Sequence, residues 1–124
     1  MLQAKKFIFY HLPPILWAVL IYFASSLPKL NISLESGSDK LAHFIVFAIF
    51  CWLVDRSLKN NENIKLKFNT IYISILLTSL YGISDEIHQY FVPNRFSDVY
   101  DVVADFFGAV GYFLFSKILN MNKK

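Results

Sequence analysis

Four long apolar segments, separated by short polar stretches, make up most of this chain of 124 residues. They lie at about residues 7–25, 40–58, 68–88 and 97–119. A helix needs about 20 residues to cross a hydrocarbon core of about 30 Å, and each segment is close to that length. The pattern therefore predicts an all-α, integral membrane four-helix bundle, formed by a single domain over residues 1–124.

Polar residues near the segment ends constrain how these helices can lie. The second segment has a spanning length only if Lys40 and His43 stand at one membrane interface. The fourth segment requires the same of Asp101 and Asp105. Charged groups are costly to place against lipid, so we expect all four to face other helices or water. Near the start of the first segment, Pro13-Pro14 should bend or delay the helix, because proline lacks an N–H donor.

The composition agrees with a membrane protein. Hydrophobic residues make up 56% of the chain and aromatic residues 18%, more than the interior of a soluble domain of this size could bury. The net charge of +3 does not come from a basic stripe with interleaved aromatic residues, so nucleic acid is not an expected partner. Membrane lipids are the expected surroundings.

The basic residues predict the orientation of the helices. Lysine and arginine near short loops are retained in the cytoplasm. With both termini inside, nine basic residues are cytoplasmic and three are not. We therefore expect a multi-pass protein of the cytoplasmic (inner) membrane with N-in/C-in topology and an extracytoplasmic functional face. The nine are Lys5, Lys6, Arg56, Lys59, Lys65, Lys67, Lys117, Lys123 and Lys124, and the three are Lys29, Lys40 and Arg95.

Most acidic residues then gather on the outer side and fall at helical spacing. Asp39 and His43 are four residues apart and share a helix face. Two polar stripes descend the third and fourth segments, and we expect them to face each other and to line an outward polar pocket. The stripes are Ser74, Thr78, Gly82, Asp85 and Gln89, and Asp98, Asp101, Asp105, Gly108 and Tyr112.

These carboxylates have a functional and a structural interpretation. A site for a cation, a headgroup or a proton transfer would use them directly. Alternatively, Lys40 and Arg95 could neutralise two of them, and Asp98 and Asp101 could cap the fourth helix. Five carboxylates over residues 85–105 exceed what two cations can satisfy, which favours function.

Metal binding and catalysis receive weaker support from the residues. His43, Asp85, Glu86 and Asp101 are of ligand type. The sequence has neither an HExxH motif nor a Cys/His spacing motif, so we expect no metal and no cofactor. If the protein is an enzyme, which the sequence leaves open, His43 and Glu86 are the acid–base candidates.

Several short motifs in order resemble the VanZ-like family of small bacterial membrane proteins over nearly the whole chain. They are Ser25-Ser26-Leu27-Pro28, Asp39-Lys40-Leu41-Ala42-His43, Asp85-Glu86-Ile87-His88-Gln89 and Pro93-Asn94-Arg95, followed by Asp101, Asp105 and Gly108. The chain departs from the family at Asn94, where glycine is usual, and at Asp105, where asparagine is common. A turn with positive φ tolerates Asn94.

The resemblance implies a four-helix protein of the cell envelope, whose named relative is associated with resistance to the glycopeptide teicoplanin. We expect the pocket to bind a lipid headgroup, a lipid-linked cell-wall precursor or a lipoglycopeptide. The alternatives are an enzyme acting on a lipid-linked envelope substrate and ion-coupled transport by an oligomer. The oligomeric state stays open. The expected binding residues are Asp39, Lys40, His43, Asp85, Glu86, Gln89, Arg95, Asp101 and Asp105.

Overall fold

Helices make up the regular structure of the chain. The computed structural model describes residues 2–28, 36–65 and 69–121, and within these ranges there is no strand. The elements in order are α1 (Leu2–Lys6), the π-helical turn η1 (Phe7–His11), α2 (Leu12–Ser26), α3 (Ser36–Lys59), the short α4 (Glu62–Lys65), α5 (Thr70–Tyr90) and α6 (Val99–Met121). The expected all-α bundle of four long helices is confirmed, and α4 is a short additional helix between α3 and α5.

Three of the four long helices are long and apolar enough to cross a membrane. They are Leu2–Ser26, Gly37–Lys59 and Val99–Met121. The fourth, α5, has 21 residues but is less apolar, because polar side chains such as Ser74, Thr78 and Gln89 occupy its buried face. The outward face of α5 is nevertheless apolar, with Leu76, Leu80 and Ile87 more than half exposed. This inverted arrangement, polar inside and apolar outside, suits a helix surrounded by lipid.

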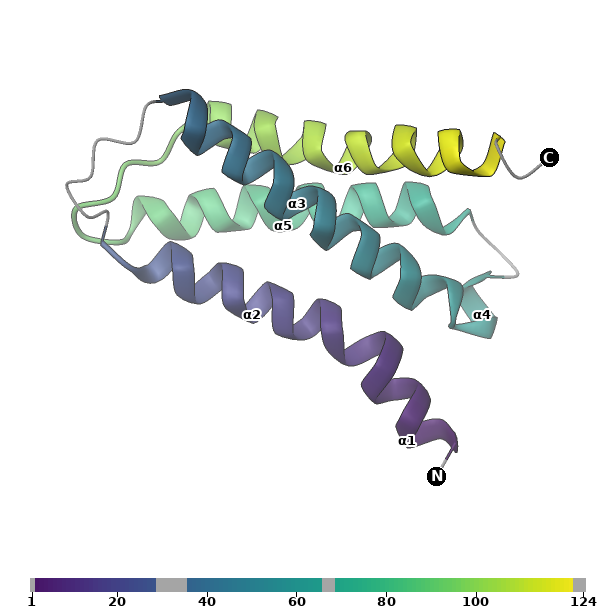
Figure 1. The fold of residues 1–124 in the computed structure, drawn as a ribbon. Coiled ribbons are helices and arrows are strands. Elements are labelled where there is room, and N and C mark those ends of the chain that lie inside the picture. The colour runs from purple at the N-terminus through teal and green to yellow at the C-terminus, as the bar shows by residue number, and fades with distance from the viewer. Residues whose placement is uncertain (1, 29–35, 66–68, 122–124) are drawn as a thin grey trace.

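The first helix bends instead of starting late. It begins at Leu2, and the wider turn η1 directly precedes Pro13 and Pro14, which occupy the first turn of α2. A π-helical turn shifts the backbone register, so the carbonyls that the proline rings would strike are moved aside. Figure 1 shows the helix changing direction at this point.

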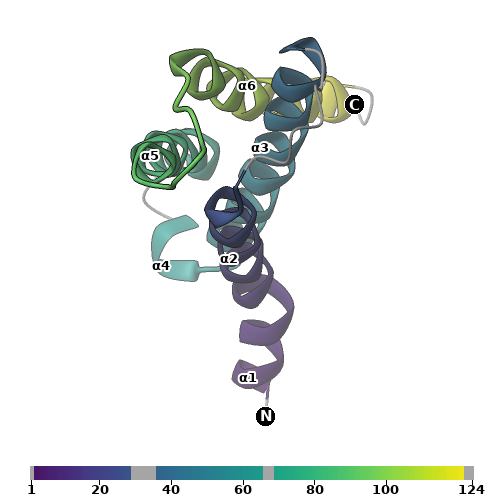
Figure 2. The same ribbon diagram turned by 90° about the vertical axis from the view of Figure 1, so that its left-hand side faces the viewer.

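The start of α1 and the end of α6 lie at one end of the bundle, and the end of α2, the start of α3 and the α5–α6 connection lie at the other (Figure 1). This arrangement is what N-in/C-in topology requires. We call the end with the α5–α6 connection the outer end of the bundle. Figure 2, viewed from the outer end, shows α3 and α5 side by side, with α6 over one flank and α2 over the other.

Small residues set the closest helix contact, between α3 and α6. A Cβ atom at Gly108 would collide with the backbone carbonyl oxygen of Phe44, and one at Gly111 would meet the Phe44 ring. Glycine therefore lets the two backbones touch, as small residues do in membrane bundles. On the other side of α3, Phe47 and Phe50 pack with Ile21 to form the apolar core, and Trp17 and Tyr81 extend it.

Candidate functional site

At the outer end, Asp85 joins α5 to α2. Its side chain is 5% exposed. The Ser25 hydroxyl donates to Oδ1 of Asp85 at 2.5 Å, and the Gln89 amide donates to Oδ2 at 2.9 Å. Asp85 and Gln89 lie one helical turn apart, so the amide reaches the carboxylate within the same helix. Both oxygens of this carboxylate are therefore paired within the protein.

Lys40 joins α3 to the start of α6. Its ammonium donates to Asp98 at 2.6 Å and also to Oδ1 of Asp101. Asp98 additionally caps α6, since its Oδ1 accepts from the backbone N–H of Tyr100 at 2.9 Å. The capping role expected for Asp98 is confirmed. Asp101 lies inside the first turn of α6 instead, and its side chain is 6% exposed.

His43 lies between two acids of α6. Its Nδ1 is 2.9 Å from Oδ1 of Asp105, which is 1% exposed. Its Nε2 faces Oδ2 of Asp101 at 3.6 Å, too far for a hydrogen bond. An ionised carboxylate can only accept hydrogen bonds, so the bond to Asp105 requires a proton on Nδ1 of His43. His43 is thus held in one orientation by a buried partner.

Glu86 fastens α5 to the beginning of α6. Its Oε2 accepts from the Ser97 hydroxyl at 3.0 Å and from the backbone N–H of Asp98 at 2.8 Å. Its Oε1 is buried and has no hydrogen-bond partner among the described residues. Oε2 of Glu86 therefore has a structural role, whereas Oε1 has no hydrogen-bond partner among the described residues.

Arg95 has a different role from the one that charge alone suggested. Its Nη1 donates to the backbone carbonyls of Ala24 at 3.2 Å and Leu27 at 3.0 Å, at the end of α2. Helix ends leave such carbonyls without partners, and an arginine satisfies them well. The idea that Arg95 neutralises a carboxylate is therefore wrong for the described contacts. The turn before it places Asn94 at φ 60°, as the replacement of glycine allowed.

The two polar stripes meet closely at Gly82 and Asp105. A Cβ atom at Gly82 would lie 2.8 Å from Oδ2 of Asp105, so α5 and α6 touch there. Further out the stripes diverge, because Asp85 turns to α2 while Asp101 turns to α3. The expected pocket lined by both polar stripes is therefore wrong for the α6 stripe: the outer ends form two hydrogen-bond networks, and only Asp85 and Gln89 of the α5 stripe line a pocket with Asp39 and His43.

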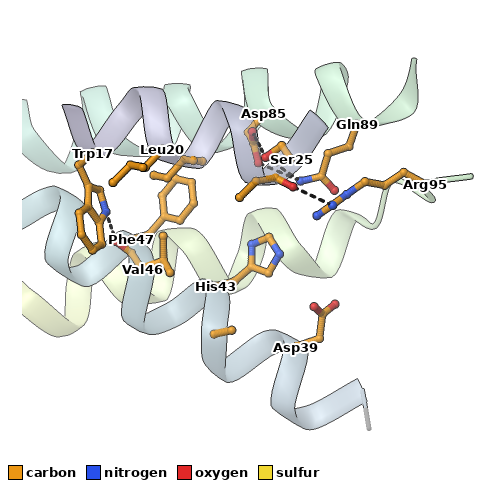
Figure 3. A pocket seen from close by; sticks show the side chains of 13 residues that line it. Trp17, Leu20, Ser25, Asp39, His43, Val46, Phe47, Asp85, Gln89 and Arg95 are labelled. Carbon is orange, nitrogen blue, oxygen red and sulfur yellow. Dashed lines mark hydrogen bonds between the residues drawn. The ribbon is translucent and has the colours of Figure 1, made fainter. Parts of the chain in front are cut away.

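A cavity of about 370 Å³ lies between α2, α3 and α5 (Figure 3). Its inner part is apolar, lined by Trp17, Leu20, Ile21, Val46 and Phe47. Its outer part is polar, lined by Ser25, Asp39, His43, Asp85, Gln89 and Arg95.

This cavity includes five of the nine expected binding residues: Asp39, His43, Asp85, Gln89 and Arg95. The other four, Lys40, Glu86, Asp101 and Asp105, are not among its lining residues. They lie behind the cavity wall and position it, because Lys40 and His43 tie α3 to α6 and Glu86 ties α5 to α6.

A further buried carboxylate, Asp55, was not among the expected site residues. It lies near the opposite end of α3 and is 0% exposed. It accepts from Lys59 at 2.6 Å, from the Thr70 hydroxyl at 2.7 Å and from the Tyr112 hydroxyl at 2.6 Å. In the sequence, Asp55 is a single acid directly after an apolar run. Acids in this position are common at the ends of membrane helices, so the pattern did not indicate a buried site.

Comparison with known proteins gives one finding. A family model described as VanZ/LLP1 matches residues 5–120, in agreement with the resemblance carried by the motifs. Searches of the curated proteins and of the solved structures return no match.

Proposed function

The chain belongs to the VanZ/LLP1 family, and we propose that it is a multi-pass protein of the bacterial cytoplasmic membrane that binds an amphiphile at its extracytoplasmic end. The observation that carries this proposal is the divided lining of the 370 Å³ cavity, which is apolar inside and polar at the outer end. Such a lining suits a molecule with one apolar chain and a polar headgroup.

The polar end of the cavity offers groups for a headgroup of mixed character. Arg95 uses Nη1 for two carbonyls, and its remaining N–H groups make no hydrogen bond that the described residues provide. A guanidinium of this kind suits a phosphate or carboxylate. Asp39 and His43 line the cavity from α3 on the same side (Figure 3) and suit hydroxyl or amine groups.

The orientation rests on charge and on aromatic residues. The positive-inside rule favours an orientation with the outer end of the bundle outside the cytoplasm. Tyr90, Phe91, Phe96 and Tyr100 surround that end and are each at least 72% exposed. Aromatic side chains concentrate where lipid headgroups meet water, so this belt supports a membrane interface at the level of the cavity mouth.

Three sources share the required chemistry: a membrane lipid, a lipid-linked cell-wall precursor and an acylated glycopeptide. Each combines an apolar chain with a polar, hydrogen-bonding head. The last source would give a resistance-type role, in which the protein sequesters the antibiotic. The family description itself leaves this choice open.

The test is to fill the cavity without touching its polar residues. Ala42 lines the cavity and is exposed, so Ala42→Trp would occupy it while leaving the bundle contacts intact. Neighbouring Leu41 is 59% exposed and does not line the cavity, so Leu41→Trp is the matched control. Native mass spectrometry of protein purified from the membrane should find an amphiphile on the wild type and on Leu41→Trp, but not on Ala42→Trp.

The mass of the bound molecule separates a phospholipid from a lipid-linked precursor. Addition of teicoplanin to the purified protein tests the third source. Equal occupancy in Ala42→Trp and Leu41→Trp would show that bound lipid is annular and that the cavity holds nothing.

An enzyme acting on a lipid-linked substrate is the second candidate, favoured by the His43–Asp105 pair. A buried carboxylate on Nδ1 leaves Nε2 of His43 as a base at the cavity. Glu86, the other expected acid–base residue, does not line the cavity and is bonded to Ser97 and Asp98. Thin-layer analysis of envelope lipids tests this candidate: identical profiles for wild type and His43→Ala under overexpression would exclude it.

A further inference from the structure

His43 has the surroundings of a metal-binding histidine. Histidines that ligate metals usually donate their other ring N–H to a carboxylate, which fixes the tautomer and the ring orientation. Asp105 provides this carboxylate at 2.9 Å from Nδ1, and it is 1% exposed. The lone pair is then on Nε2, which is directed towards Asp101.

Two acids complete a set of three donors around that nitrogen. Asp39, His43 and Asp101 each offer one ligand atom, and these atoms lie within 4.8 Å of one another. Asp39 is one helical turn before His43 on α3, and Figure 3 shows both side chains on the same side of that helix. Metal–ligand bonds of about 2.0–2.2 Å place the ligand atoms of a tetrahedral site about 3.4 Å apart, so the three atoms need to approach one another by about 1 Å. Small side-chain movements would therefore suffice to close the set on one ion.

An independent observation is the excess of buried negative charge beside this set. Glu86 Oε1 and Asp105 Oδ2 are both buried without a hydrogen-bond partner among the described residues. Glu86 lies close enough to Asp101 and His43 to interact with their charges. An unpaired buried carboxylate oxygen is costly, and a cation at the neighbouring donor set would offset that cost, although Oδ2 of Asp105 itself faces Gly82 of α5.

Neither Lys40 nor Arg95, the lysine and the arginine in the described part of the outer end, supplies this positive charge. Lys40 forms ion pairs with Asp98 and Asp101, and Arg95 donates to backbone carbonyls at the end of α2. On Asp101, Lys40 occupies Oδ1, whereas Oδ2 is the oxygen turned towards His43. A dication at the three donors would bind Oδ2 of Asp101, and Lys40 would stay bonded to Oδ1.

We propose that Asp39, His43 and Asp101 bind a divalent transition-metal ion, with Asp105 as the positioning residue of His43. One imidazole nitrogen with two carboxylate oxygens suits Zn²⁺ or Mn²⁺. The sequence predicted no metal because no ligand motif is present. Here the donors come from two helices, α3 and α6, which are far apart in the sequence, so no local motif contains all three. The inference goes beyond the proposed function, although Asp39 and His43 also line the cavity.

The test uses metal alone on the full chain in detergent, so it is independent of any amphiphile. After removal of bound metal with a chelator, ZnCl₂ and MnCl₂ are titrated calorimetrically. The wild type should bind one ion per chain to saturation. Asp39→Asn should weaken binding at least about tenfold, since even the loss of a residue that only orients a ligand commonly costs about 10–100-fold, and His43→Gln should abolish it.

Two controls keep the result specific. His88→Gln removes another histidine of the outer end, and Asp98→Asn removes an acid that is not a proposed ligand. Both should bind like the wild type. Near-ultraviolet circular dichroism without metal establishes that each variant is folded, and half-buried Asp39 offers a variant with little risk to the fold. No binding by the wild type would overturn the proposal, as would equal affinity in folded Asp39→Asn, or equal affinity for Ca²⁺.

Discussion

The hydroxyl of Tyr112 on α6 lies 2.6 Å from Oδ2 of Asp55 on α3 and donates to it. Thr70, at the start of α5, donates to the other oxygen at 2.7 Å. One fully buried carboxylate therefore ties three helices together at the end of the bundle opposite the cavity. A charge placed at this depth is stable only when donors from the protein replace water.

Removal of this carboxylate should destabilise the protein strongly. Asp55→Ala leaves the Thr70 and Tyr112 hydroxyls without their acceptor and should cost about 3 kcal/mol in the free energy of unfolding. Lys59→Ala should cost less than about 1 kcal/mol, because the Lys59 side chain is 52% exposed. Equilibrium unfolding in mixed detergent micelles measures both. Equal costs for the two variants would contradict the central role of Asp55.

The contact between α3 and α6 should depend on the absence of a side chain at Gly108. A methyl group there meets the Phe44 carbonyl, so Gly108→Ala should force the backbones apart and lower the free energy of unfolding by about 1–3 kcal/mol. Gly37→Ala is the matched control, since a Cβ atom at Gly37 has nothing within 4 Å. That variant should be unchanged or slightly more stable, because alanine favours helices. The same unfolding experiment compares them.

The sequence was sufficient to predict the helices but not their partners. Apolar segments of spanning length gave α2, α3, α5 and α6 with ends within a few residues, because length and hydropathy are local properties. The pairing of Asp85 with Ser25, or of Asp55 with Tyr112, depends on how helices rotate about their axes. Spacing within one helix shows which residues share a face, but not which neighbour that face meets.

Charge counting misjudged Arg95 for a related reason. A cation near acids suggests an ion pair, yet the unsatisfied carbonyls at the end of α2 are closer acceptors in the folded chain. The role of Asp98 as a helix cap could be predicted, because a cap is defined by neighbours in the sequence.

The orientation of the bundle can be tested with single cysteines. Asn94 lies in the exposed turn between α5 and α6, whereas Asn63 is exposed in α4 near the other end. With N-in/C-in topology, Asn94→Cys should react with a membrane-impermeant maleimide in intact cells, and Asn63→Cys only after permeabilisation. The native Cys51 is 0% exposed and should give little background. The reverse labelling pattern would place the cavity on the cytoplasmic side.

The bond between Asp105 and His43 predicts a difference between two substitutions at one position. Asp105→Asn keeps an oxygen acceptor for the Nδ1 proton of His43 and removes a buried charge, so its stability should stay within about 1 kcal/mol of the wild type. Asp105→Leu has a similar volume but no polar atom, and a buried Nδ1 left without a hydrogen-bond partner in either tautomer should cost about 1–3 kcal/mol.

The ¹⁵N chemical shifts of His43 report directly on this bond. Wild type and Asp105→Asn should show the proton on Nδ1, whereas Asp105→Leu should shift towards the other tautomer, because the carboxylate that selects Nδ1–H is gone. His88 in the last turn of α5 bonds to Ser26 and serves as an internal reference in the same spectrum. If His43 keeps its Nδ1 proton in Asp105→Leu, then another group orients the ring and Asp105 is only a packing residue.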